Sequence, residues 1–168
     1  DVKGAFAVKD LRSGEICTFN ENEVVPSASL IKMFILIKTF DLIREGRLSL
    51  TDEIEVKAGD IVAFSVLEFL APRKYMLEEL LRLMIVYSDN TATNVLMDKL
   101  GIDQINEEIK KLGYRDSKLC RKMMDFKAAE EGRQNYTSVK EMFDLIDRLY
   151  SSTLLGSPYD EQMLEIMK

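Results

Sequence analysis

The sequence predicts a mixed α/β fold of the α+β class, in which one N-terminal β-hairpin precedes about seven helices. Two observations carry this prediction: alternating apolar residues around a turn in the first twenty positions, and apolar residues at helical spacing over most of the remaining chain. The chain has 168 residues, the size of one ordinary domain. We therefore expect one domain over 1–168, with the hairpin in 1–25 and a mainly helical part in 26–168.

The first element is a hairpin. Ala5–Val8 is an apolar run, and Glu15–Phe19 alternates polar and apolar residues. Asp10–Gly14 between them carries the Asp, Ser and Gly residues that favour tight turns. A two-stranded hairpin is marginally stable by itself, so it calls for further strands, but no later segment shows a strand pattern.

The second element is a helix from about Leu30 to Arg44. Pro26–Ser29 introduces it, and Gly46 ends it in the usual role of a glycine after a helix. Apolar residues occupy most of its circumference: Leu30, Ile31, Phe34, Ile35, Ile37, Leu42 and Ile43. Because a helix that is apolar nearly all round is buried, we expect it at the centre of the fold.

Further helices follow from the same spacing and from the turn residues between them. They are predicted over 60–70, 77–87, 91–100, 103–112, 137–149 and 157–168. Ser138 is the expected N-cap of the fifth of these, with Glu141 as its capping-box partner. Residues 119–135 have no clear pattern.

The composition excludes several classes of function. The chain has 23 basic and 29 acidic residues, a formal net charge of −6, so we expect no nucleic-acid partner. No apolar run approaches the roughly 20 residues of a membrane span. With no histidine and two distant cysteines, Cys17 and Cys120, a four-ligand zinc site cannot form, and we expect no metal and no cofactor. The two cysteines could form one bridge, but we favour two separate buried thiols.

The missing histidine also excludes Ser-His-Asp and Cys-His nucleophiles. A serine can instead be activated by a lysine whose ammonium is destabilised by burial. Ser29 and Lys32 lie three residues apart at the start of the most apolar helix, a spacing that places them on one face. Such a pair is common by chance, and a serine before a helix is usually an N-cap, a role that Ser27 could take instead.

The tripeptide Ser88-Asp89-Asn90 is a second candidate site. Between two apolar helices, these residue types usually form a turn and an N-cap. The tripeptide is nevertheless rare by chance, and the flanking helices could fold it back beside Ser29. There Ser88 would relay a proton, and Asn90 would donate a hydrogen bond to a substrate amide.

The two motifs and their neighbours resemble a known family. Ser-x-x-Lys followed by Ser-Asp-Asn is similar to the first two signatures of class A β-lactamases and related penicillin-recognising serine enzymes. Val25–Lys32, Met84–Asn94 and Asn135–Ser138 resemble, in this order, the nucleophile segment, the helix-loop-helix of the second motif and the end of the Ω-shaped loop. The resemblance covers nearly all of the chain.

The resemblance implies a β-lactamase in which Ser29 attacks a β-lactam or acyl-D-alanyl carbonyl and forms an acyl-enzyme. Lys32 would act as base or in the proton relay, Ser88 would pass a proton to the leaving nitrogen, and Asn90 would bind the side-chain amide of the substrate. The substrate would be a small molecule, a β-lactam or a peptidoglycan-like peptide. The resemblance also implies a helical subdomain beside an antiparallel sheet and an extracytoplasmic location; it leaves the oligomeric state open.

Two departures from the family pattern limit this interpretation. The third signature, Lys-Thr-Gly, is absent, since the one Lys-Thr pair, Lys38-Thr39, lies inside the first helix. In the family, this motif and the remaining sheet strands follow the part that 1–168 resembles. We therefore expect the chain to be the N-terminal and helical part of such a domain, weakly active or inactive alone.

The second departure concerns the glutamate that activates water for deacylation in class A enzymes. Aligning Leu119-x-Arg121 with the family places Met123 near the position of that glutamate. Glu131 has the family's spacing to a following asparagine, Asn135, but lies late in the loop. Either Glu131 is the base, or the loop has none and the chain is a D-alanyl-D-alanine peptidase-like or penicillin-binding protein with slow deacylation. A non-catalytic binding module of the same fold is a further alternative.

Overall fold

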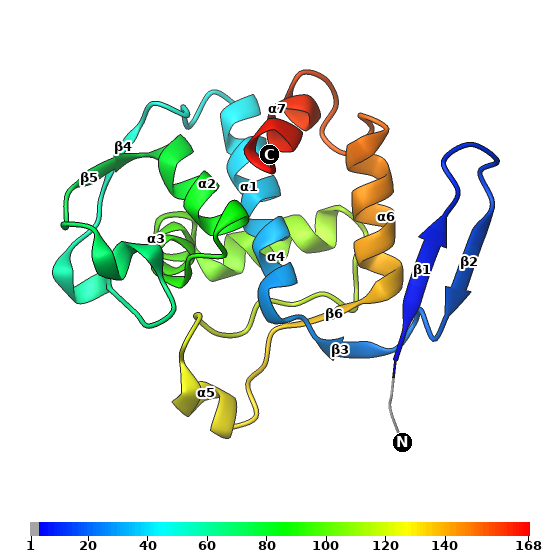
Figure 1. Ribbon diagram of the computed structural model, residues 1–168, viewed down its shortest axis with the longest axis horizontal. Coiled ribbons are helices and arrows are strands. Elements are labelled where there is room, and N and C mark those ends of the chain that lie inside the picture. The colour runs from blue at the N-terminus through cyan, green and yellow to red at the C-terminus, as the bar shows by residue number, and fades with distance from the viewer. Residues whose placement is uncertain (1–3) are drawn as a thin grey trace.

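The structure, a computed structural model, describes residues 4–168, and it has the mixed architecture that the sequence predicts (Figure 1). Its α-helices are α1 (Lys32–Arg44), α2 (Leu77–Val86), α3 (Asn90–Leu100), α4 (Ile102–Lys111), α5 (Phe126–Glu130), α6 (Val139–Tyr150) and α7 (Tyr159–Ile166). Within the described range, the strands form two-stranded antiparallel sheets: β1 (Phe6–Lys9) with β2 (Ile16–Phe19), β3 (Val24–Pro26) with β6 (Tyr136–Ser138), and β4 (Glu53–Glu55) with β5 (Lys74–Met76).

Helix α1 is the centre of the core, as its apolar sequence predicts. It packs against α2, α3, α4 and α7, and Figure 1 shows it between α2 and α6. Phe34 and Phe40 are among its completely buried side chains. Gly46 ends the helix with a φ of 70°, a left-handed conformation that glycine adopts without steric cost.

The hairpin of β1 and β2 forms as predicted, with Phe6 opposite Phe19. It lies at the outer edge of the molecule beside α6 (Figure 1), and β1 contacts that helix. Residues 1–3 of the predicted hairpin region lie outside the described residues. The expectation that no strand follows the hairpin is wrong: β3, β4, β5 and β6 are each three residues long. Such short strands cannot show an alternating pattern in the sequence.

Two short 3₁₀ turns, Ala58–Asp60 and Val66–Phe69, replace the predicted helix over 60–70. In the segment between these two turns, backbone groups form hydrogen bonds with side chains rather than the backbone hydrogen bonds of a helix. The Val62 N–H donates to the hydroxyl of Thr91, at the start of α3, at 2.9 Å. Side-chain hydrogen bonds of this kind compete with helix formation, and they fasten the segment to α3.

Helix α6 begins at its predicted cap, since Ser138 Oγ accepts a hydrogen bond from the Glu141 N–H. The reciprocal half of the predicted capping box is wrong. The Glu141 carboxylate instead accepts hydrogen bonds from the backbone N–H groups of Arg115, Asp116 and Ser117, at 2.5 to 2.9 Å. It therefore holds the loop after α4 against α6.

Both cysteines are unpaired, as expected. Their predicted burial is wrong for Cys17, which is exposed, and Cys120 is half-buried. Cys17 is exposed because it belongs to β2, whose residues are all exposed within the described part of the chain.

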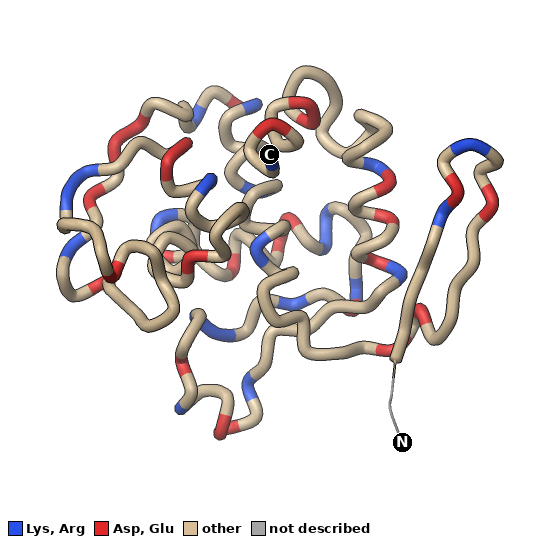
Figure 2. Tube along the Cα trace, viewed as in Figure 1, with Lys and Arg blue, Asp and Glu red and all other residues tan. Residues whose placement is uncertain are grey.

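Surface charge is spread over the fold rather than gathered by sign. Figure 2 shows Lys and Arg interspersed with Asp and Glu along most of the chain. No helix among residues 4–168 has the length and apolar character to cross a membrane.

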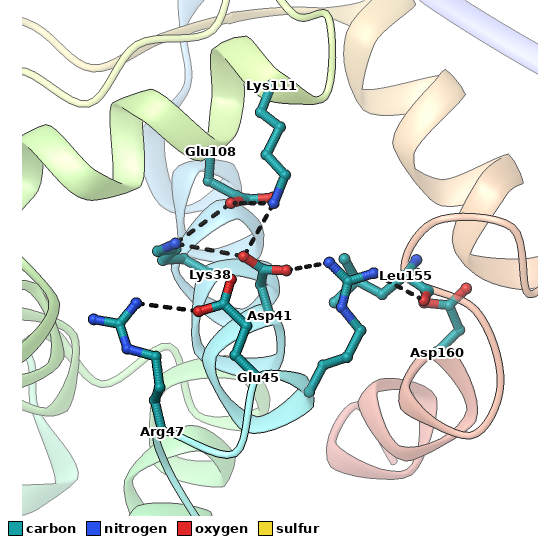
Figure 3. A network of polar contacts seen from close by, with 9 residues as sticks. Lys38, Asp41, Glu45, Arg47, Glu108, Lys111, Leu155 and Asp160 are labelled. Atoms are coloured by element: carbon teal, nitrogen blue, oxygen red, sulfur yellow. Dashed lines mark hydrogen bonds and ion pairs between the residues drawn. The ribbon is translucent and has the colours of Figure 1, made fainter.

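A buried ionic network joins α1 to α4 (Figure 3). Asp41 is completely buried and pairs with Arg44 and, at 3.2 Å, with Lys111. Glu108 of α4 pairs with Lys38 and Lys111, each at 3.4 Å. Burial by itself raises the pKa of Asp41, but hydrogen bonds with Glu108, Lys111 and Arg44 hold it below its usual value. Burial, with the hydrogen bond and charge of Asp41, raises the pKa of Glu108.

Replacing Asp41 with asparagine is expected to lower the free energy of unfolding by about 2 kcal/mol, because the largely buried Lys38 and the partly exposed Arg44 and Lys111 lose a completely buried counter-charge. Urea unfolding of the full-length protein measures this change. The folded pKa of Asp41 lies below its usual 3.8, so its contribution is present above pH 3.8 and is lost as the pH falls through the folded pKa. The control Glu45→Gln breaks the exposed pair with Arg47 and is expected to cost less than about 1 kcal/mol. Equal losses would contradict the role of the network.

Candidate active site

Ser29 and Lys32 lie where the 3₁₀ turn Ala28–Ile31 meets α1. The Ser29 side chain is exposed, whereas Lys32 is 2% exposed. Ser88 joins the two residues: its Oγ lies 2.9 Å from Lys32 Nζ and 2.9 Å from Ser29 Oγ. The hydrogen bonds among residues 4–168 include no direct one between Lys32 and Ser29. The lysine therefore reaches the candidate nucleophile through Ser88.

Ser27 occupies the N-cap position of this turn, as the sequence suggests, but its side chain does not act as a cap. It makes no side-chain cap hydrogen bond, and its buried hydroxyl donates to the Ala28 carbonyl at 3.3 Å. Its N–H donates to the Asn135 carbonyl at 2.8 Å. Ser27 therefore holds the segment that carries Ser29 against the loop before β6, and the hydroxyl of Ser29 makes no cap hydrogen bond.

The Ser88–Asn90 turn separates α2 from α3. Ser88 has a φ of 54°, which is uncommon for a residue other than glycine, and its carbonyl accepts a hydrogen bond from Lys32 Nζ at 2.6 Å. Asp89 is completely buried and caps α3, accepting from the Ala92 N–H at 2.7 Å and from the Leu67 N–H at 3.0 Å. The motif is thus both an N-cap and a partner of Lys32.

Asn90 completes the surroundings of Lys32. Its Oδ1 accepts a hydrogen bond from Lys32 Nζ at 3.1 Å. Its Nδ2 donates to the backbone carbonyls of Ala63 and Phe64, at 3.3 and 3.2 Å. Asn90 Nδ2 thus has two backbone acceptors, and its Oδ1 helps to hold Lys32. Its hydrogen bond to a substrate amide stays a prediction.

Burial destabilises the ammonium of Lys32. It lowers the pKa of Lys32 from 10.5 to about 8, while the charge of Asp89 opposes part of this change. Three acceptors surround Nζ: the carbonyl and hydroxyl of Ser88 and the amide oxygen of Asn90. With such a pKa, roughly one tenth of the lysine is neutral at pH 7, and this fraction can accept a proton.

A pocket of about 370 Å³ lies beside Ser29. It is lined by Pro26, Ala28, Ser29, Asn90, Arg121, Met123, Met124, Phe126, Gln134 and Asn135. Arg121 is the one charged side chain among these lining residues, and none of them is an acid. Elsewhere in residues 4–168, no group of three or more His, Cys, Asp or Glu residues could hold a metal ion.

Two asparagines that the sequence analysis did not single out for this role fix the pocket's loop. Asn94 of α3 accepts from the Met123 N–H at 2.8 Å and donates to the Met123 carbonyl at 3.1 Å. Asn135 is buried, and its Oδ1 accepts from the N–H groups of Cys120 and Arg121 at 2.7 and 3.0 Å. Asparagines commonly bond to nearby backbone, but their sequence positions carry no sign of which distant loop they hold.

Glu131 and Met123 have different positions relative to the pocket. Glu131 is exposed, forms an ion pair with Arg133 and is not among the pocket-lining residues. Met123 lines the pocket with Ser29. Of the two possibilities for the loop, this geometry favours one in which Glu131 is a solvated acid and no carboxylate faces Ser29.

Comparison with known proteins gives consistent matches. The family model described as the β-lactamase enzyme family matches residues 1–168. A β-lactamase of Streptomyces albus G is 28% identical over 172 residues, covering 96% of this chain and 54% of its own length. The β-lactamase regulatory protein BlaB of Streptomyces cacaoi is 30% identical over 116 residues, covering 67% of this chain and 37% of its own length.

Solved structures agree with these matches. The crystal structure of a β-lactamase from Sphaerobacter thermophilus has a TM-score of 0.87 and 30% identity, covering 97% of this chain and 62% of its own. The structure of PBP-A has a TM-score of 0.83 and 28% identity, covering 97% and 60%. The matched region thus spans about half of the Streptomyces albus G β-lactamase, little more than a third of BlaB and about three fifths of these solved chains. Its fold is that of the β-lactamases, and the chain belongs to the β-lactamase enzyme family.

Proposed function

We propose that the protein is a serine hydrolase that forms an acyl-enzyme on Ser29 with a β-lactam or an acyl-D-alanyl peptide. The observation that carries this proposal is the continuous hydrogen-bonded path from Ser29 through Ser88 to a buried Lys32 of lowered pKa. Serine nucleophiles need an adjacent base, and in a chain without histidine this path supplies one. Family membership supports the same activity.

The path defines the proton transfers of acylation. Neutral Lys32 takes the proton of Ser88, Ser88 takes the proton of Ser29, and Ser29 Oγ forms a bond to the substrate carbonyl carbon. The C–N bond of the lactam or peptide then breaks. The proton held on Lys32 returns through Ser88 to the leaving nitrogen, which leaves an ester on Ser29 and both relay residues in their starting states.

The pocket supports slow deacylation as a second candidate property. Hydrolysis of the ester needs a water activated by a base, and the loop residues beside Ser29 are Met123, Met124 and Phe126. Such surroundings fit a penicillin-binding or peptidase-like protein better than a fast β-lactamase. Among the similar solved structures, a variant of PBP-A is an acyl-enzyme complex with penicillin G.

The setting of this activity is also a proposal. We infer that the protein works outside the cytoplasmic membrane on a small-molecule substrate, because β-lactams and peptidoglycan-like peptides are encountered there. Residues 1–168 are proposed to act as part of one domain, with the hairpin in 1–25 and the mainly helical part in 26–168.

Mass spectrometry of the full-length protein with benzylpenicillin tests the proposed function. The expected result is a covalent adduct of the whole penicillin on Ser29 that persists over minutes, because the pocket lacks a base. An adduct that turns over rapidly would identify a β-lactamase with its base elsewhere. Absence of any adduct on the folded protein would refute the enzyme proposal and favour a non-catalytic binding module.

Acylation is expected to accelerate with rising pH. Because neutral Lys32 is the proton acceptor and its pKa is about 8, the reactive fraction grows about tenfold per pH unit below pH 8 and levels off above it. Stopped-flow or quenched measurements of adduct formation between pH 6 and 9.5 give the profile. A rate independent of pH over this range would reassign the base.

A further inference from the structure

Arg121 lines the pocket beside Ser29 and is a cation that forms no ion pair with an acid among residues 4–168. Of the residues that line this pocket, it alone is charged. The ion pairs formed within residues 4–168 involve the nearby Lys122 and Arg133 but not Arg121. A half-buried guanidinium with no counter-charge is a favourable position for an anion.

The present partners of Arg121 are neutral. Its Nε and Nη2 donate to the side-chain oxygen of Gln134 at 3.2 and 2.9 Å, and its Nη1 donates to the Lys122 carbonyl at 3.1 Å. A guanidinium has five N–H groups, so these contacts leave two of them free. Amide oxygens hold the group in place, but they do not neutralise its charge.

The position of Arg121 is fixed by the fold. Asn135 bonds to both backbone groups of Arg121. Its Oδ1 accepts from the Arg121 N–H at 3.0 Å, and its Nδ2 donates to the Arg121 carbonyl at 3.1 Å. Apolar side chains of Met123, Met124 and Phe126 line the same pocket. They lower the local dielectric constant, which strengthens an ionic contact made there.

We propose that Arg121 determines specificity by binding a carboxylate on the acyl side chain of the substrate. The inference rests on the proposed acylation of Ser29, because the acyl side chain of the substrate stays attached to that residue and shares its pocket. A carboxylate can accept two parallel hydrogen bonds from a guanidinium. The preferred substrates are therefore β-lactams or peptides whose acyl group carries a second negative charge.

A matched pair of penicillins tests this proposal. Carbenicillin is benzylpenicillin with one added carboxylate on the acyl side chain, so the ratio of their acylation rates isolates that group. In the full-length protein, Arg121→Gln is expected to lower the carbenicillin-to-benzylpenicillin ratio about tenfold, as loss of a charged hydrogen bond implies. Arg121→Lys should restore part of the ratio because it keeps the charge.

The control is Arg133→Gln, which removes an exposed arginine that does not line the pocket and should leave the ratio unchanged. If Arg121 only fastens the loop, Arg121→Gln will slow both penicillins equally, and this result overturns the inference. No adduct from either penicillin refutes the proposed function itself, whereas adducts with an unchanged ratio refute only the role of Arg121.

A measurement on the unmodified protein decides the question if Arg121→Gln does not fold. Added salt screens an attraction between Arg121 and the extra carboxylate, so the ratio should fall by about threefold between 0.05 and 0.5 M salt. The net charge of −6 on residues 1–168 would by itself repel the more anionic penicillin, and screening of that repulsion would raise the ratio. A constant or rising ratio therefore overturns the proposal.

Discussion

Replacing Lys32 with alanine is expected to slow acylation of Ser29 by about 10²- to 10⁴-fold, the usual contribution of a general base. The buried ammonium has a pKa of about 8 and lies 2.9 Å from the hydroxyl of Ser88, which is 2.9 Å from that of Ser29. Without the lysine, the proton of the nucleophile has no acceptor along this path. The adduct formed with benzylpenicillin, followed by mass spectrometry over time, gives the rate.

Two further variants make this prediction specific. Ser29→Ala should form no adduct, because the attacking oxygen is absent, and an adduct on that variant would move the nucleophile elsewhere. Lys99→Ala removes an exposed lysine of α3 and should acylate at the rate of the unmodified protein. Thermal unfolding of each variant separates loss of chemistry from loss of fold. A folded Lys32→Ala protein with an unchanged rate would exclude the relay.

Replacing Met123 with glutamate is expected to speed hydrolysis of the acyl-enzyme by about 10²-fold. The Met123 side chain lines the pocket with Ser29, and Asn94 holds its backbone by two hydrogen bonds. A carboxylate placed there would face the ester with its backbone already fixed. It would supply the base that the pocket-lining residues lack. The decay of a preformed adduct, followed after removal of free penicillin, measures the effect.

Met123→Gln is the matched control, since glutamine has the size of glutamate without its basic carboxylate. Its adduct should decay at nearly the rate of the unmodified protein. If glutamine accelerates decay as much as glutamate does, the effect comes from opening the pocket to water. If neither variant accelerates decay, position 123 is not where water attacks. Rapid decay in the unmodified protein followed by slow decay in Glu131→Gln would instead assign the base to Glu131.

Secondary structure that depends on residues close together in the sequence could be predicted from the sequence. Helix α1, the glycine at its end and the Ser138 cap of α6 depend on residues a few positions apart, so spacing and capping rules apply to them. The pairing of β3 with β6 could not be predicted, because it joins short segments more than a hundred residues apart in the sequence. The helix predicted over 60–70 failed for a related reason: the hydroxyl of Thr91 bonds to its backbone from another element.

The candidate site also has features that the sequence determines and features that depend on the tertiary structure. By itself, the sequence determined the types of residue available: no histidine, one Ser-x-x-Lys motif, one Ser-Asp-Asn motif, and hence the family. Only the tertiary structure decided that Ser88 stands between Ser29 and Lys32, that burial lowers the pKa of Lys32, and that Arg121, and no acid, lines the pocket beside Ser29. Side-chain chemistry is a property of each residue, but distance, burial and charge pairing depend on which segments fold against it.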